Sequence, residues 1–191
     1  MKNQGFTLLE LLISITVIAI LTSISFWGYN AKKDTLVLRD EVGIIASKTE
    51  NMRERAIGSQ YWHEKLPSGG YGMFFTISND NQYITFADCD GNELFDPNTL
   101  LCGIAGGFRE RIETTYLNDR LKIKDINVID IGGEIGVSEL TIVYKFPFPR
   151  AVIKDETGTT FDNANIVIGI PGRQDQEKTI HFNSAGLIYV Q

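Results

Sequence analysis

An acid-rich segment that begins at Asp88 carries the residue types that a cation site needs. Carboxylates and amides recur at its relative positions 1, 3, 5 and 9, on Asp88, Asp90, Asn92 and Asp96. This alternation turns several oxygens inward around a tight loop, and oxygen is the ligand that Ca²⁺ prefers. The EF-hand pattern is not met, because Gly91 stands at position 4 and Thr99 stands where the bidentate Glu is expected. A polar turn in which Asp and Asn bond their own backbone is the alternative, and both interpretations stay open.

Two cysteines, Cys89 and Cys102, are the only ones in the chain. We predict a disulfide between them if this region lies outside the cytoplasm, where such bonds persist. In the chain-entropy view the closed loop would add roughly 3 kcal/mol of stability. Two unpaired buried thiols are the alternative.

The remaining polar residues give no positive case for catalysis. His63 and His181 are isolated in the sequence, and neither cysteine has a His and an acid at a suitable local spacing. The glycines between Gly103 and Gly107 follow no convincing strand and open no helix, so a turn is favoured over a nucleotide cradle. We therefore predict that the chain is not an enzyme.

The charge balance argues against nucleic acid as the main partner. The chain has 18 Lys+Arg against 24 Asp+Glu, a formal net charge of -6, whereas binding through phosphates needs clustered cations. Arg109 and Arg111 alternate with apolar residues. Two arginines in an acidic chain are more typical of a solvated strand face than of a DNA-binding edge.

A further carboxylate, Glu10, lies inside an apolar run from Phe6 to Trp27. As a helix this run spans roughly 33 Å, enough to cross a hydrocarbon core of about 30 Å once. A cleaved secretory signal fits poorly, because the run is long and lacks a small-x-small site. A plain signal anchor explains the length but not the acid, whose burial in lipid costs about 2.5–3.5 kcal/mol. An interfacial Glu10 that reaches towards water is the remaining alternative.

The residues around Glu10 read MKNQ followed by Gly5-Phe6-Thr7-Leu8-Leu9-Glu10. This pattern resembles the class III signal of type IV pilins and type II secretion pseudopilins, over about the first fifth of the chain. The resemblance implies that a prepilin peptidase cuts after Gly5, methylates the new amino group of Phe6 and leaves the apolar helix in place. It also implies other pilin or pseudopilin subunits, an inner-membrane assembly platform and membrane lipid as partners.

Glu10 has a physical reason to be retained in such a filament. A buried negative charge among parallel helices seeks a positive partner. The α-amino group of Phe6 on a neighbouring subunit is one, and such a pair would fix the axial register of the subunits. We therefore predict that Glu10 is an assembly residue.

Periodicity after the apolar run predicts that the helix continues. Spacings of four and three residues separate the members of one apolar stripe: Leu38, Val42, Ile45, Thr49, Met52 and Ala56. Gly58-Ser59 offers a C-terminal stop. The prediction is one helix from about Phe6 to about Ile57, hydrophobic all round in its first half and amphipathic in its second.

Strand patterns separated by turn residues follow from residue 60 onwards. Asn79-Asp80-Asn81 lies between strands at 71–78 and 82–87 and predicts a hairpin. Further strands are predicted at 109–117, 122–131, 139–146, 164–170, 178–182 and 186–190. Since no helix alternates with them, the fold class is α+β, with the long N-terminal helix packed on an antiparallel β-sheet head. The predicted parts are a leader at 1–5, a membrane and assembly half-helix at 6–28, an amphipathic half at 29–58 and a head at 59–191.

Short motifs of the head resemble the H-type, FimT-like minor pseudopilins and pilins. They are Pro67-Ser68-Gly69-Gly70-Tyr71-Gly72, a strand that ends in Ala87-Asp88, and the terminal Phe182-Asn-Ser-Ala-Gly-Leu-Ile-Tyr189. The resemblance implies a pilin-like fold with a single-pass anchor in the cytoplasmic membrane and an extracytoplasmic head. Some pseudopilins use calcium in the head, which would suit the acidic segment.

The predicted function is a structural subunit of a type IV pilus or a type II secretion pseudopilus. Chain length and the H-like ending favour a minor subunit. The alternative is a membrane-anchored extracytoplasmic protein that binds calcium or DNA and does not polymerise.

Overall fold

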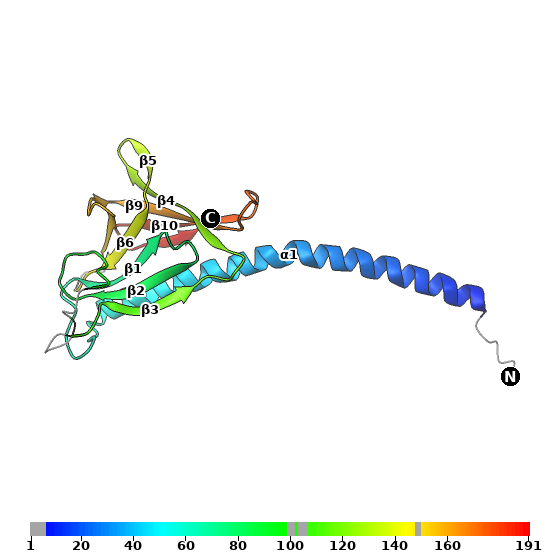
Figure 1. Cartoon of the computed structure of the whole chain (residues 1–191), viewed down its shortest axis with the longest axis horizontal. Helices are drawn as coiled ribbons and strands as arrows, with labels where there is room; N and C mark the ends of the chain where they lie inside the picture. The colour runs from blue at the N-terminus through cyan, green and yellow to red at the C-terminus, as the bar shows by residue number, and fades with distance from the viewer. Residues whose placement is uncertain (1–6, 99–101, 103–106, 148–149) are drawn as a thin grey trace. The chain divides into compact units, whose positions relative to one another are not determined.

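The structure is a computed structural model that describes residues 7–98, 102, 107–147 and 150–191; for 26–31 it describes the helical backbone alone. The chain forms two compact units, Met1–Val37 and Leu38–Gln191. Helix α1 (Leu8–Ile57) contributes residues to both (Figure 1). The α+β fold predicted from the sequence, with a long N-terminal helix and antiparallel sheets, is confirmed.

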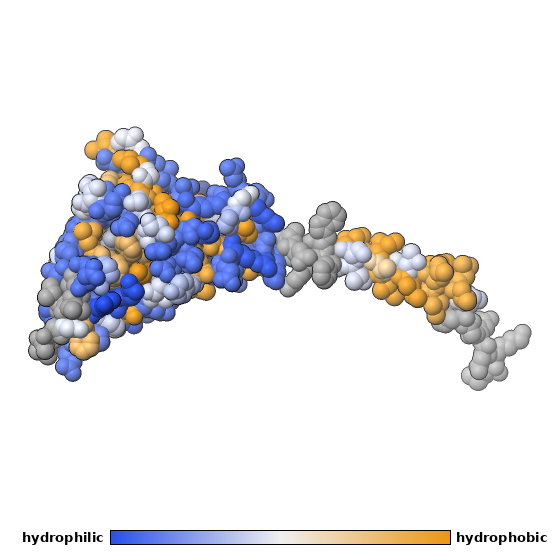
Figure 2. All heavy atoms as spheres, viewed as in Figure 1, coloured by the Kyte–Doolittle hydropathy of each residue, from blue (hydrophilic) through white to orange (hydrophobic). Residues whose placement is uncertain are grey.

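The first unit contains the apolar part of α1. Its residues Leu8–Ser25 have a mean hydropathy of 2.2 and form the one candidate membrane span in the described part of the chain (Figure 2). Serine and threonine hydroxyls in this segment bond back to carbonyls four residues earlier. Ser14 donates to the Glu10 carbonyl at 2.7 Å, and Thr22 donates to the Ile18 carbonyl at 2.7 Å. Each such hydroxyl is satisfied within the helix, as a lipid environment requires.

The second part of α1 packs by the stripe that the sequence predicts. All six stripe residues, Leu38 to Ala56, are at most 4% exposed. The helix ends at Ile57, where the N–H of Gly58 donates to the Glu54 carbonyl and that of Gln60 to the Arg55 carbonyl. Ser59 takes the left-handed conformation (φ 48°) that a helix C-terminus needs, so the stop is confirmed, with Ser59 rather than Gly58 in that conformation.

Strands β1 to β11 form two antiparallel sheets in the described chain. The six-stranded sheet has the order β3-β2-β1-β6-β7-β8, with bounds Arg111–Tyr116, Gln82–Asp88, Gly70–Thr76, Glu139–Tyr144, Ala151–Asp155 and Thr160–Phe161. The five-stranded sheet has the order β11-β10-β9-β4-β5, with bounds Ile188–Val190, Glu177–Asn183, Asn163–Gly169, Lys122–Asp130 and Gly133–Gly136. Strands β5, β7 and β8 were not among those predicted.

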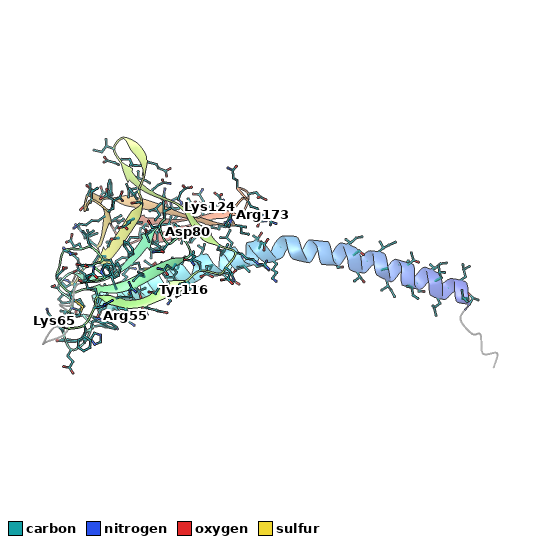
Figure 3. The ribbon with its side chains drawn as sticks, in the orientation of Figure 1. Arg55, Lys65, Asp80, Tyr116, Lys124 and Arg173 are labelled. Atoms are coloured by element: carbon teal, nitrogen blue, oxygen red, sulfur yellow. A yellow bond between two sulfur atoms is a disulfide. The ribbon has the colours of Figure 1, made fainter. Side chains whose placement is uncertain are left out.

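The predicted hairpin at 79–81 is confirmed, and its turn also joins the two sheets. The carboxylate of Asp80, labelled in Figure 3, forms an ion pair with Lys122 at 2.7 Å, and the Asp80 backbone carbonyl accepts a hydrogen bond from the Ile123 N–H at 2.7 Å. Phe75 of β1 and Phe182 of β10 bring their ring centroids to 6.2 Å. The core of the head therefore lies between the stripe of α1 and both sheets.

Candidate functional site

Thr7 and Glu10 form a reciprocal cap at the start of α1. Glu10 Oε2 accepts hydrogen bonds from the Thr7 backbone N–H and from the Thr7 hydroxyl, each at 2.9 Å. The Glu10 N–H donates to Thr7 Oγ1 at 3.3 Å. This is a capping box, which satisfies backbone donors that a helix start leaves free. This role was not predicted from the sequence, although Thr-x-x-Glu before an apolar run is its usual signature. The predicted processing residues Gly5 and Phe6 lie outside the described residues.

The predicted disulfide between Cys89 and Cys102 is present, with their Cα atoms 5.2 Å apart. Both cysteines are buried. Cys102 also pairs with Phe108 through two backbone hydrogen bonds of 3.2 and 3.4 Å. The bond therefore fixes the far end of the acidic segment against the end of β2, and it suits an oxidising compartment.

Most of the acidic segment builds its own turns. Asp90 accepts the Asn92 N–H at 3.0 Å, Asn92 accepts the Leu94 N–H at 2.7 Å, and Asp96 accepts the Asn98 N–H at 2.8 Å. Each contact spans two residues, which is the polar-turn alternative named from the sequence. These side chains are thus at least partly used by the backbone.

Asp88 and Asp90 nevertheless come together with a third carboxylate, that of Glu110. One oxygen from each of the three lies within 4.8 Å of the others. Asp96 is not part of this group. Glu110 was not predicted as a ligand. Its place beside the acidic segment depends on a backbone hydrogen bond of 2.9 Å, in which the Ala87 N–H donates to the Glu110 carbonyl. We call Asp88, Asp90 and Glu110 the carboxylate cluster.

Two members of the carboxylate cluster are fully buried and hydrogen-bonded. Asp88 accepts the N–H groups of Gly91 and Glu93 at 2.7 and 2.8 Å. Glu110 accepts the N–H groups of Cys89 and Asp96, both at 3.1 Å. The two acids therefore fix the backbone of the acidic segment from Cys89 to Asp96.

Burial controls the protonation of these two acids. It raises the pKa of Asp88 to about 7; the hydrogen bond from Gly91 opposes this rise, and the neighbouring Asp90 adds to it. Burial also raises the pKa of Glu110 to about 7 against its two backbone hydrogen bonds. A proton or a cation would relieve the repulsion between these groups near neutral pH.

The loop is also attached to the six-stranded sheet by ion pairs. Glu93, which takes a φ of 64°, pairs with Lys145 and, at 2.9 Å, with Lys154. Lys154 donates to the Asn92 carbonyl at 2.9 Å as well. These contacts position the carboxylate cluster beside the ends of β6 and β7.

Comparison with known protein families finds a match at the N-terminus of the chain. Residues 1–26 match the family description of a prokaryotic N-terminal methylation motif. No curated protein and no solved structure matches the chain.

The matched residues cover the predicted class III signal and the whole of the candidate membrane span. An apolar N-terminal helix within this motif is consistent with a single-pass membrane anchor and an extracytoplasmic head. The motif and the α+β architecture together support membership of the type IV pilin and pseudopilin family, whose proteins are structural rather than enzymatic.

Proposed function

We propose that this chain is a structural subunit that polymerises, through the apolar part of α1, into a type IV pilus or a type II secretion pseudopilus. The observation that carries the proposal is the segment Leu8–Ser25: it is apolar on all sides, belongs to a methylation motif and contains the single acid Glu10. A helix that is apolar all round is stable only inside lipid or among other helices. Lipid holds it before assembly, and neighbouring subunits replace lipid in the filament.

In this proposal a prepilin peptidase cuts after Gly5 and methylates Phe6. The capping box is unaffected by the cut, because it involves Thr7 and Glu10 only. Glu10 Oε1 accepts no hydrogen bond from a described residue, so it is available to the Phe6 amino group of a neighbouring subunit. The pair sets the register of helices that the assembly platform adds one at a time.

The mature N-terminus and the filament fraction test this function. Mass spectrometry should find a chain that starts at N-methyl-Phe6. Filaments sheared from the cells or from a secretion system should contain it as a minor component, in keeping with an H-type, FimT-like subunit. A chain that keeps Met1, or a processed chain that stays wholly with the membrane, would refute the proposal.

The carboxylate cluster favours one second function, an anchored protein whose head binds calcium. Two buried acids and Asp90 offer oxygens within 4.8 Å of one another, and oxygen ligands suit Ca²⁺. Asn92 and Asp96 also belong to the predicted ligand set, but their side-chain oxygens already accept backbone N–H groups. They could ligate an ion only with the lone pairs that these hydrogen bonds leave. Thermal unfolding of the detergent-solubilised chain with Ca²⁺, and then with a chelator, tests this function. A melting temperature that changes with neither Ca²⁺ nor the chelator would refute the calcium-binding function.

A further inference from the structure

Strand β11 forms one edge of the five-stranded sheet, and among the described strands it pairs with β10 alone. Its pairing extends to the residues on either side of the strand. The Asn183 N–H donates to the Leu187 carbonyl at 3.2 Å. Gln191 and Thr179 exchange two backbone hydrogen bonds, of 3.0 and 3.2 Å. Residues 187–191 therefore form one extended stretch, which we call the β11 edge.

The β11 edge presents backbone groups that no described strand uses. Neighbouring residues of an antiparallel strand turn their N–H and C=O groups in opposite directions. Because Leu187 and Gln191 bond towards β10, Ile188 and Val190 turn their backbone groups away from it. No backbone hydrogen bond joins these outward groups to another described residue. Such a row of donors and acceptors is a template for a further strand.

The core-facing side of the sheet is also left uncovered at this edge. Val190 pairs with Ile180, and Ile188 pairs with Phe182. Residues that pair directly share a face of the sheet. Ile180 and Phe182 are at most 2% exposed, whereas Val190 is 44% exposed. One more strand beside β11 would therefore cover Val190 and continue the apolar face of the core.

The other edges of the two described sheets carry features that usually prevent such pairing. Strand β3 contains Arg111 and Glu113, and strand β5 contains Glu134. Strand β8 is very short and is followed by Asp162. By contrast, residues 184–191 contain no charged residue and no proline, and the register of β11 with β10 runs without a shift. The β11 edge therefore lacks the charges, prolines and bulges that keep other strands away.

We propose that the β11 edge binds an extended segment of a different protein by β-strand addition. The segment exchanges backbone hydrogen bonds with Ile188 and Val190. Its side chains on the core side are apolar, because they continue the face that ends at Val190. Two β11 edges paired with each other would form a closed twofold dimer, which does not repeat along an open filament. The choice of a different protein therefore rests on the proposed function, whereas strand addition itself does not.

Hydrogen exchange on the full chain in detergent tests this proposal. The probe is the peptide acetyl-Lys-Thr-Val-Thr-Val-Thr-Lys-amide. The control is the same peptide with proline at two consecutive central positions, which interrupts both of its hydrogen-bonding edges. The amides of Ile188 and Val190 should exchange more slowly with the probe and at an unchanged rate with the control. Equal exchange in the two mixtures would overturn the proposal.

Val190→Pro separates binding from folding. It removes an N–H that points away from β10, so the unfolding midpoint should stay near that of the wild type, while the probe no longer slows exchange at Ile188. Val190→Lys keeps the N–H but adds a charge to the edge, and it should lose the response as well. Ile135→Lys, at an exposed position on the edge strand β5, is the matched control and should keep it. A response that survives both Val190 variants would place the peptide on another surface and overturn the assignment.

The protein concentration distinguishes a different protein from a second copy. Without peptide, the amides of Ile188 and Val190 should exchange freely at every concentration. Slow exchange that becomes faster on dilution would mean that two β11 edges pair with each other, and it would overturn the assignment to a different protein. Failure of filament formation would leave these results in detergent unchanged, so the two proposals fail separately.

Discussion

At the scale of single residues, Glu10 has an observed role in the helix cap and a proposed role in assembly, and chemistry can separate the two. A carboxylate and a carboxamide serve equally at the third position of a capping box. Only the carboxylate can compensate a buried amino group. The hydrogen bonds with Thr7 therefore explain why the helix tolerates Glu10. In the proposed filament, the charge is the property that glutamine would not replace.

We predict that Glu10→Gln preserves the helix and membrane insertion but lowers filament incorporation at least roughly tenfold, because loss of one partner of a buried pair costs about 3–5 kcal/mol. The measurement is the ratio of subunit in sheared filaments to subunit in the membrane. Glu54→Gln, at an exposed position further along α1, should assemble normally. Normal assembly of Glu10→Gln combined with failure of Glu10→Ala would show that the cap alone matters.

The buried acids Asp88 and Glu110 predict the pH dependence of the head. Their folded pKa of about 7 lies above the ordinary values of 3.8 and 4.5, so the folded state holds protons that the unfolded state has released. Between about pH 4 and 7 stability therefore falls as the pH rises, and the loss is complete above 7. The unfolding midpoint measured in chelator should thus be higher at pH 5 than at pH 8.

Two comparisons bear on this pH prediction. Glu110→Gln should make the unfolding midpoint depend less on pH, because one of the two carboxyl groups with a raised pKa is removed. If the carboxylate cluster binds calcium, the ion should raise the midpoint at pH 8 far more than at pH 5. A midpoint that rises with pH in chelator would contradict the assignment of the slope to these acids.

At the scale of elements, the start of β1 fits against the buried Asp88. A Cβ on Gly69 would lie 1.6 Å from Asp88 Oδ2. Gly69→Ala should therefore destabilise the head by roughly 3 kcal/mol, as overpacking does, and lower the midpoint by about 6–12 °C. Gly132→Ala is the matched control, because a Cβ there meets nothing, and its midpoint should not move. Equal midpoints for the two variants would show that the loop yields freely.

The sequence predicts those elements whose residues repeat with a clear period. The stripe from Leu38 to Ala56 was predictable because one helix face carries it and the sheets bury that face. Strand β5 was not predicted, because all four residues of Gly133–Gly136 are exposed and show no alternation of buried and exposed positions. Among the described strands it pairs with β4 alone, so pairing rather than composition makes it a strand.

The candidate cation site was predictable in part, for a related reason. Asp88 and Asp90 are two residues apart in the sequence, and this local spacing was enough to predict both as ligands. Glu110 enters the carboxylate cluster through its backbone bond to Ala87 next to the β2–β3 pairing, which no local spacing encodes. Asn92 was predicted as a ligand because polar residues alternate along the segment, yet its side-chain oxygen accepts a backbone N–H. Local pattern thus identifies turns more surely than it identifies ligands that converge from distant strands.

At the scale of the whole molecule, the disulfide depends on the membrane span. Cys89 and Cys102 are oxidised only if the head leaves the reducing cytoplasm. The described chain offers one apolar helix, Leu8–Ser25, to carry it across. The redox state of two cysteines in the head therefore reports on insertion by a helix far away in the sequence, whatever the arrangement of the two units.

This dependence gives a prediction that needs no filament. Ile18 lies in the span and is 62% exposed on its helix, so Ile18→Arg breaks no packing within the chain but costs insertion about 3 kcal/mol. The variant should lose membrane association and expose both thiols to an alkylating reagent, as seen by a mass shift. Ile44→Arg, at a 46% exposed position outside the span, should keep the anchor and the disulfide. If Ile18→Arg stays oxidised in the membrane fraction, Leu8–Ser25 is not what carries the head out of the cytoplasm, and the helix proposed to polymerise is not the membrane anchor.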